Sequence, residues 1–144
     1  MCEDGSRTCS FERASKIDVP IEFEKVAADG LPRDANWLIG VTLLAEVCGA
    51  LGDGERAESL YAQLEPYAGR NVVVGRAATC NGAASRLLGI LAAAMASWEL
   101  AEGHFISALA MHEAMGARPW VARTQLAYAE MLLTRRRRGD KARA

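Results

Sequence analysis

An internal repeat with a period of 44 residues limits the fold of this chain more than any other feature. The segment LLAEVCGALGDGERA at 43–57 aligns without gaps with LLGILAAAMASWELA at 87–101. A third copy begins with AYAEM at 127–131 and reaches GDKARA at 139–144, after a three-residue insertion that arginines fill. A self-match at this period is typical of solenoids that stack helical hairpins.

The composition favours helices throughout the repeat. Ala occupies 27 of the 144 positions, whereas Pro occupies 4 and aromatic residues make up 6%. Because Ala loses no side-chain entropy in a helix, a chain so rich in Ala and poor in Pro is expected to be helical. Apolar residues account for 51% and charged residues for 24%, a balance typical of globular chains and not of disordered ones.

Glycine and proline divide the chain into helices separated by short turns. Gly52 ends one predicted helix, and Gly116 and Pro119 separate two others. The run RNVVVG at 70–75 is the one β-like stretch, and we expect it to form an extended connector because it is short and isolated. The predicted helices span 34–51, 55–67, 77–96, 98–115 and 120–135.

The chain divides into a tail and one repeat domain. Residues 1–19 have mixed charge and no sustained period, so we expect a flexible N-terminal segment. The repeat domain is expected to cover 20–144. It opens with a short amphipathic helix after Pro20 and ends in an incomplete final hairpin.

Large and small residues follow the same order in the first two repeats. The first helix carries a large residue and then a small one. The second helix carries a small residue, an aromatic residue four positions on, and a further apolar residue. This order agrees with tetratricopeptide-like (TPR-like) hairpins, in which the small residue lets the second helix approach closely. We therefore predict an all-α, TPR-like right-handed helical-hairpin solenoid of about two and a half repeats. The residues concerned are Leu44 and Ala45 with Ala57, Tyr61 and Leu64, and Leu88 and Gly89 with Ala101, Phe105 and Ala108.

Four stretches of the sequence resemble a known class of repeat. They are PRDANWL at 32–38, LAEVCGALGD at 44–53, LYAQLEPYAGRNVVVG at 60–75 and GARPWVARTQLAYAEMLL at 116–133. Together they resemble the TPR-like C-terminal helical-repeat region of bacterial STAND-type signalling ATPases. That group includes LuxR-type transcriptional regulators and adenylate or guanylate cyclase-ATPase fusion proteins. The resemblance covers residues 20–144 and implies a regulatory module for signal transduction or transcription that binds an inducer or a partner protein.

No set of residues in the sequence forms a catalytic, cofactor or metal site. There is no GxxxxGK[ST] phosphate loop, so the nucleotide hydrolysis of that class is not implied. His104 and His112 do not have the i, i+4 spacing of a zinc-binding helix, and Ser85 has no GxSxG elbow. We expect a non-enzymatic protein without cofactor or metal. Cys48 and Cys80 are expected to be small buried hydrophobic residues, and Cys2 and Cys9 exposed tail thiols.

Two features bear on where the protein resides. The longest uncharged apolar stretch, Leu87–Trp98, has twelve residues, whereas a membrane-spanning helix needs about twenty. The N-terminal sequence MCEDGSRTCS is acidic and has no apolar segment typical of a secretory signal. We therefore expect a cytoplasmic protein with no membrane partner.

The repeat geometry predicts a binding face on the first helix of each hairpin. In TPR-like stacks, ligands usually contact the side chains of these helices on the concave face. Counted from the leucine and the small residue that follows it in each first helix, the equivalent positions are Thr42, Glu46, Arg86, Arg123 and Glu130. Their charges would bind a peptide or another domain through charge-assisted hydrogen bonds. Alternatively, the two arginines pair with the two glutamates between neighbouring hairpins.

The third of these helices is expected to mediate self-association. Because its hairpin is incomplete, Leu126, Met131, Leu132 and Leu133 are expected to form an apolar surface without a covering partner. This pattern predicts a homodimer through the helix at 120–135.

The run Arg135–Arg138 falls where the repeat expects a turn between two helices. Consecutive cations can hold phosphates, but we prefer a solvated turn because no aromatic residues interleave with the run. The sequence thus favours a protein-protein interaction or regulatory module. The alternatives are a small-molecule sensor, with the ligand between hairpins or at a dimer interface, and weak nucleic-acid binding through the arginine run.

Overall fold

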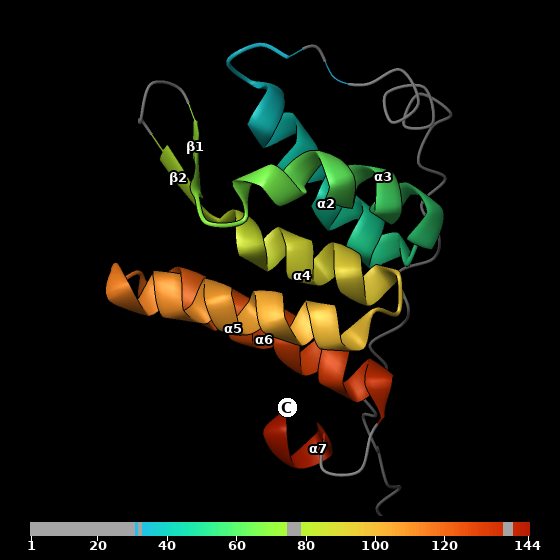
Figure 1. Cartoon of the computed structure of the whole chain (residues 1–144). Coiled ribbons are helices and arrows are strands. Elements are labelled where there is room, and N and C mark those ends of the chain that lie inside the picture. The colour runs from blue at the N-terminus through green and yellow to red at the C-terminus, as the bar shows by residue number, and fades with distance from the viewer. Residues whose placement is uncertain (1–30, 32, 75–78, 137–139) are drawn as a thin grey trace, which may run out of the picture. The chain divides into compact units, whose positions relative to one another are not determined.

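The structure is a computed structural model that describes residues 31, 33–74, 79–136 and 140–144. Helices make up most of these residues (Figure 1). The expected flexible segment at 1–19 and the short helix after Pro20 lie outside these residues. The chain belongs to the broadly all-α class that its composition predicts. In chain order the helices are α2 (Trp37–Leu51), α3 (Gly54–Leu64), the 3-10 turn η1 (Glu65–Tyr67), α4 (Ala84–Ala94), α5 (Trp98–Ala114), α6 (Arg118–Arg135) and α7 (Asp140–Arg143).

The turn between α2 and α3 shows how local sequence sets the helix ends. Gly52 follows α2 with φ 67°, in the left-handed region that glycine adopts without steric cost. Asp53 then caps α3, because its carboxylate accepts the Arg56 backbone N–H at 3.1 Å. The predicted boundary at Gly52 is therefore correct.

A short antiparallel hairpin precedes α4, where the sequence analysis expected a connector and the start of a helix. Strand β1 (Asn71–Val74) pairs with β2 (Thr79–Ala83), so the prediction of an isolated extended segment at 70–75 is wrong. The predicted helix at 77–96 begins only at Ala84. Gly82, with φ 81°, lies in β2 just before this start. The β-branched residues of β1 form a sheet because β2 supplies hydrogen-bonding partners that the local sequence does not reveal.

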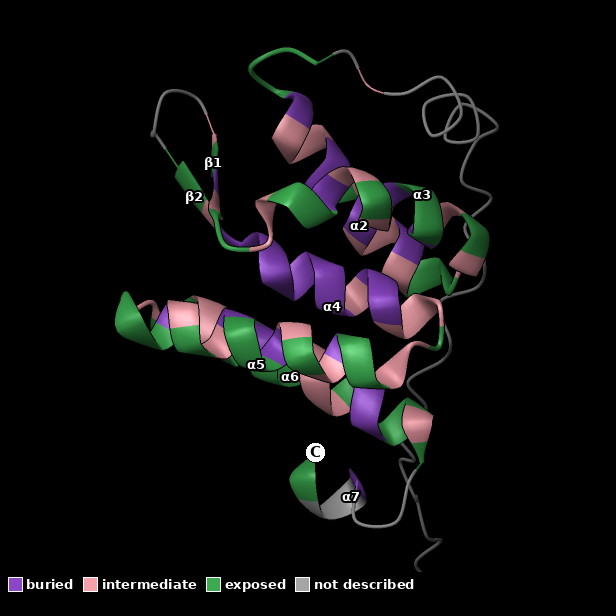
Figure 2. Cartoon of the chain, viewed as in Figure 1, coloured by how far each residue is buried: buried purple, intermediate pink, exposed green. Residues whose placement is uncertain are grey.

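Helix α4 lies at the centre of the fold and packs against α2, α3, α5 and α6. It is buried along most of its length (Figure 2). On one side, the core joins α4 to α2 and α3 through Val41, Ala45, Cys48, Ala57, Leu60, Leu64, Leu87, Leu88 and Leu91. On the other side, it joins α4 to α5 and α6 through Ala92, Ala101, Phe105, Met131 and Leu132.

Gly89 allows α5 to approach α4 closely. A Cβ atom at this position would lie 2.8 Å from the Phe105 ring, closer than atoms in contact can be. Gly89 and Phe105 are the small residue of a first helix and the aromatic residue of the following second helix in the sequence pattern. The structure places them in direct contact, as the pattern predicts.

In the described part of the chain, none of the helices has both the length and the apolar character needed to cross a membrane.

Candidate functional site

A groove of about 650 Å³ lies between α2, α4 and α6, the helices that the sequence pattern predicts to be first in each hairpin. It is open to solvent, and its lining is mostly apolar, with four charged side chains, Glu46, Arg86, Arg123 and Glu130. The groove brings together four of the five residues that the repeat geometry predicts for a concave face. The principal lining residues are Glu46 from α2, Arg86 and Ile90 from α4, Trp98 from α5, and Arg123, Leu126, Ala127 and Glu130 from α6.

One ion pair crosses the groove between α2 and α4. The Arg86 guanidinium donates from Nη2 to Glu46 Oε1. The Arg86 side chain is buried, whereas about a third of Glu46 remains exposed. Of the two expectations for these residues, pairing between neighbouring hairpins is therefore the one that the structure shows.

The Trp120 ring lies close to the guanidiniums of two groove residues, Arg86 and Arg123. The Cζ atom of Arg86 is 5.5 Å from the ring centroid, and that of Arg123 is 5.1 Å away. Both distances are within the range of cation–π attraction. The ring thus helps to orient Arg123 on α6 without neutralising its charge.

Arg123 and Glu130 differ from the Arg86–Glu46 pair because both are exposed. Neither makes a salt bridge to any residue within the described ranges. Leu126 lies between them on α6 and is 61% exposed. The α6 wall of the groove therefore presents a cation, an apolar side chain and an anion that are available to a ligand.

Thr42 does not belong to this surface. It is buried, and its hydroxyl donates to the Ile39 backbone carbonyl at 2.8 Å. Its hydroxyl is therefore satisfied within α2, which corrects the prediction that it faces a ligand.

The four residues expected to form an apolar surface on α6 divide into two pairs. Met131 and Leu132 are buried in the core with Phe105, so the expectation that they are uncovered is wrong. Leu126 and Leu133 are 61% and 50% exposed, as expected. The helical period places the two pairs on different sides of α6.

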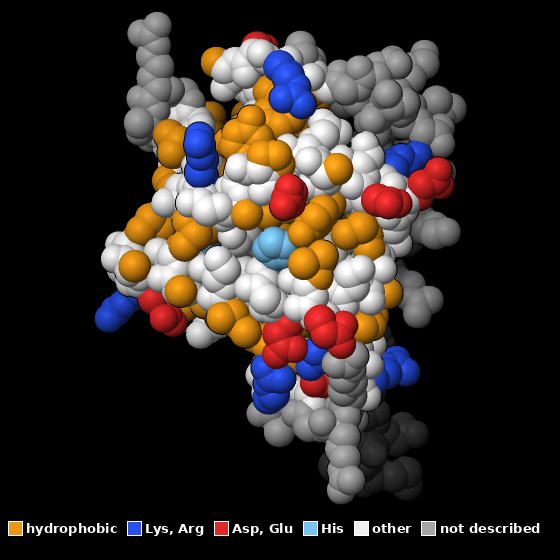
Figure 3. Space-filling model, viewed as in Figure 1, with side chains coloured by type: hydrophobic (Ala, Val, Ile, Leu, Met, Phe, Trp, Pro, Cys, Tyr) orange, Lys and Arg blue, Asp and Glu red, His pale blue; other side chains and the backbone are white. Residues whose placement is uncertain are grey.

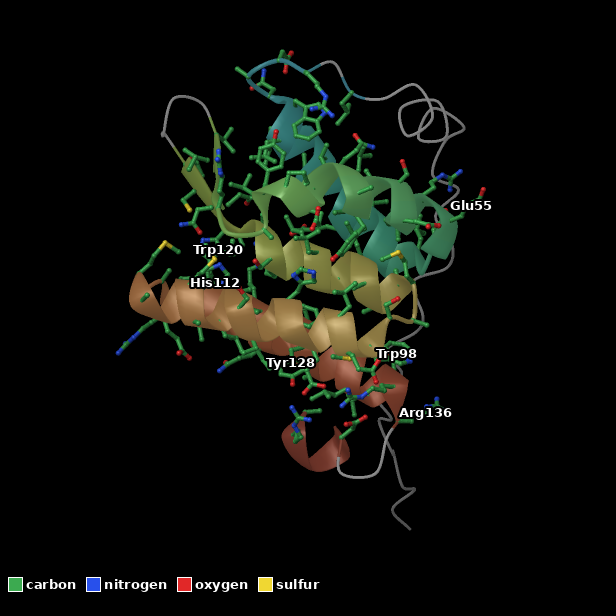
Figure 4. The ribbon with its side chains drawn as sticks, in the orientation of Figure 1. Glu55, Trp98, His112, Trp120, Tyr128 and Arg136 are labelled. Atoms are coloured by element: carbon green, nitrogen blue, oxygen red, sulfur yellow. The ribbon has the colours of Figure 1, made fainter. Side chains whose placement is uncertain are left out.

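A buried histidine joins the β-hairpin to α5 and α6, a feature that the sequence analysis missed. His112 Nε2 accepts the Ala83 backbone N–H at 2.8 Å, so the proton of the neutral ring is on Nδ1. Nδ1 then donates to Thr124 Oγ1 at 3.1 Å, and the Thr124 hydroxyl donates to the Trp120 carbonyl. His112 and Trp120 lie close together, away from the end of α6 that carries Arg136 (Figure 4). Burial, followed by the charge of Arg86, lowers the pKa of His112 and keeps the ring neutral.

A cluster of charges fixes α7 against α5 and α6. Glu102 accepts from the Tyr128 hydroxyl at 2.6 Å and from Arg135 at 2.7 Å, and it also pairs with Arg143. These hydrogen bonds lower the pKa of Glu102 to about 2, and the bond from the Tyr128 hydroxyl has the largest effect. Arg135 also donates to both Asp140 carboxylate oxygens. The side chain of Arg135, the first arginine of the basic run, is thus a buried structural cation, so the expectation of a solvated turn is wrong for this residue. Arg137 and Arg138 lie outside the described residues.

A different face of the molecule, which Figure 3 shows over α3, α4 and α5, carries the two helices predicted to be second in their hairpins, α3 and α5. Hydrophobic and charged side chains are intermixed there. Tyr61 of α3 and His104 of α5 are linked by a 2.7 Å hydrogen bond between the Tyr61 hydroxyl and His104 Nε2. Burial lowers the pKa of His104. This contact joins α3 to α5, as the ion pair in the groove joins α2 to α4.

The side chains that bind metals most readily are dispersed over the described ranges, and no three of them cluster there. Cys48 is fully buried, as expected, and desolvation raises the pKa of its thiol. Cys80 lies exposed in β2, so the expectation that it is buried is wrong.

Comparisons with protein-family models, with curated proteins and with solved structures returned no match to this chain.

Proposed function

We propose that this chain is a non-enzymatic, TPR-like helical-repeat module that binds a protein partner in the groove between α2, α4 and α6. The groove itself supports this proposal most directly. It gathers charged and apolar side chains from α2, α4, α5 and α6, and part of that charge has no partner within the described residues. Such a surface can recognise a partner both by shape and by charge.

The turns between helices support the 44-residue repeat on which this proposal depends. Gly52 and Ala96 are one period apart and both have left-handed backbones, with φ of 67° and 56°. The next residue in each turn bonds back to the preceding helix. Asp53 N–H donates to the Cys48 carbonyl at 3.2 Å, and Ser97 N–H donates to that of Ala92 at 2.9 Å. Two helix ends with the same geometry at one period favour a common hairpin design.

The packing order of the helices also favours a solenoid. Each helix packs against the next one in the chain, and α4 packs against α2 and α6. Contact confined to neighbouring hairpins is characteristic of repeat proteins. The sequence resemblance to the repeat regions of signalling ATPases suggests that the partner is a protein of signal transduction or transcription in the cytoplasm.

The proposal is tested by affinity capture with matched variants. The immobilised protein is exposed to a cell lysate, and captured proteins are quantified by mass spectrometry. The double variant Arg123→Ala/Glu130→Ala should lose the partner by about tenfold, since it removes both available charges of the groove. Arg118→Ala removes an exposed cation from α6 outside the groove and should retain the partner. A partner retained equally by all three proteins would contradict the assignment of the groove.

A small-molecule sensor is the second candidate, favoured by the size of the groove. Its volume of about 650 Å³ lies within the range of about 300–1,000 Å³ that small-ligand sites occupy. Trp98 supplies aromatic surface to it. A screen for compounds that raise the melting temperature distinguishes this candidate, because a ligand that binds the folded state stabilises it. The stabilisation should be lost in Arg123→Ala/Glu130→Ala.

A further inference from the structure

A stripe of exposed residues runs along α6, and three of its members line the groove. Pro119, Arg123, Leu126, Glu130 and Leu133 are all exposed and follow one another at spacings of four, three, four and three residues. This spacing keeps the side chains on one side of a helix, as in the seam where two helices pack together. We call this set the α6 stripe.

The α6 stripe is complementary to itself. Arg123 and Glu130 are seven residues apart, which is about 10 Å along a helix, and Leu126 lies between them. When a second copy of the stripe runs in the opposite direction, Arg123 faces Glu130 of the partner subunit. The same contact is then repeated by symmetry, and the two Leu126 side chains meet near the two-fold axis. A parallel arrangement would instead place like charges opposite each other.

We propose that two copies of this chain form a two-fold symmetric homodimer in which their α6 helices pack antiparallel along the α6 stripe. This inference rests on the proposed function, because it names a second copy of the chain as the partner on the α6 wall of the groove. A two-fold interface requires one patch to be its own complement. The α6 stripe meets this requirement with unlike charges on the two sides of Leu126 and with exposed leucines that gain burial on contact.

Charge-reversal variants test both the dimer and its direction by sedimentation equilibrium of the purified protein. Arg123→Glu gives the stripe two anions, and Glu130→Arg gives it two cations. Each variant alone should dimerise about 30-fold more weakly than the wild type, because two attractive contacts become repulsive. A mixture of the two variants should recover wild-type affinity, since an antiparallel pair then again joins unlike charges. The double variant Arg123→Glu/Glu130→Arg should recover it as well.

Several outcomes would overturn the proposal. These are a wild-type protein that is monomeric at micromolar concentration, variants that dimerise unchanged, and a mixture that fails to recover affinity. All substitutions are at exposed positions, and circular dichroism of each variant serves as the control for folding. The dimer and the proposed function fail in different ways. If the protein is monomeric but still captures a partner through Arg123 and Glu130, only the dimer is refuted. If the protein dimerises but its capture of other proteins does not depend on the groove residues, only the binding of another protein in the groove is refuted.

Discussion

Replacement of the buried His112 should destabilise the fold and change its response to pH. In His112→Leu, the Ala83 backbone N–H loses its acceptor in a site where His112 itself is fully buried. An unsatisfied buried donor costs about 1–3 kcal/mol. The leucine retains most of the apolar volume, so we expect a net loss of about 2 kcal/mol in the free energy of unfolding. Thr124→Val leaves the bond to Ala83 in place and should cost less, about 1 kcal/mol.

The pH response follows from the lowered pKa of His112. Below the ordinary His pKa of 6.5, the unfolded chain takes up a proton at this residue while the folded chain does not. The free energy of unfolding of the wild type should therefore fall as the pH is lowered through 6.5. His104 contributes in the same direction, but it is present in both proteins. The difference between wild type and His112→Leu isolates the contribution of His112, and this difference should shrink as the pH falls.

Urea unfolding at a series of pH values measures both effects. The midpoint should shift to lower urea in His112→Leu at neutral pH with an unchanged slope, which indicates a change in stability alone. A loss below about 0.5 kcal/mol, the range of ordinary surface substitutions, would refute the role of the Ala83 hydrogen bond. A difference between the two proteins that stays constant with pH would refute the buried neutral state of the ring.

Three further predictions concern the turns and the packing between helices. Gly89→Ala should lower stability by about 1–3 kcal/mol in urea unfolding, because its methyl group would overlap the Phe105 ring; an unchanged midpoint would contradict the close approach of α4 and α5. Ala96 and Gly52 both have positive φ, which glycine adopts at the least cost. Ala96→Gly should therefore raise the melting temperature and Gly52→Ala should lower it, each by the equivalent of about 0.5–1 kcal/mol. Shifts of the same sign would show that the two turns differ. Glu102→Gln should weaken the hydrogen-exchange protection of α7, which the Arg135–Asp140 pair still partly holds, and in the wild type this protection should weaken as the pH falls from 4.5 toward 2, where Glu102 takes up a proton. Protection of α7 that is unchanged in the variant would show that Glu102 does not help to hold it.

Local pattern was sufficient to predict most of the helices. The helix predicted at 98–115 corresponds to α5 (Trp98–Ala114), and Gly52 ends α2 where expected. The β-hairpin was not predictable in the same way. The register that sets Val73 opposite Cys80 depends on a partner strand across a turn. A run of valines reports only a tendency to be extended, and the presence of a second strand decides whether a sheet forms.

The candidate site shows the same division between local and tertiary information. Helical periodicity placed Glu46, Arg86, Arg123 and Glu130 on equivalent helix faces, and the structure brings them to one groove. Which charges remain available was decided by packing between helices. Arg86 is paired with Glu46, whereas Arg123 is not paired within the described residues. The burial of Met131 and Leu132 likewise depends on α4 and α5, which the sequence of α6 alone does not reveal.

The central claim is that the molecule associates through the face formed by its first helices. A dilution series followed by amide ¹⁵N–¹H correlation spectra tests this claim most directly, because it requires no knowledge of another partner. We predict that concentration-dependent shifts cluster on α6, at Arg123, Leu126 and Glu130, and extend to the groove residues of α2 and α4. Spectra that do not change with concentration, or shifts that cluster on α3 and the outer side of α5, would contradict the claim.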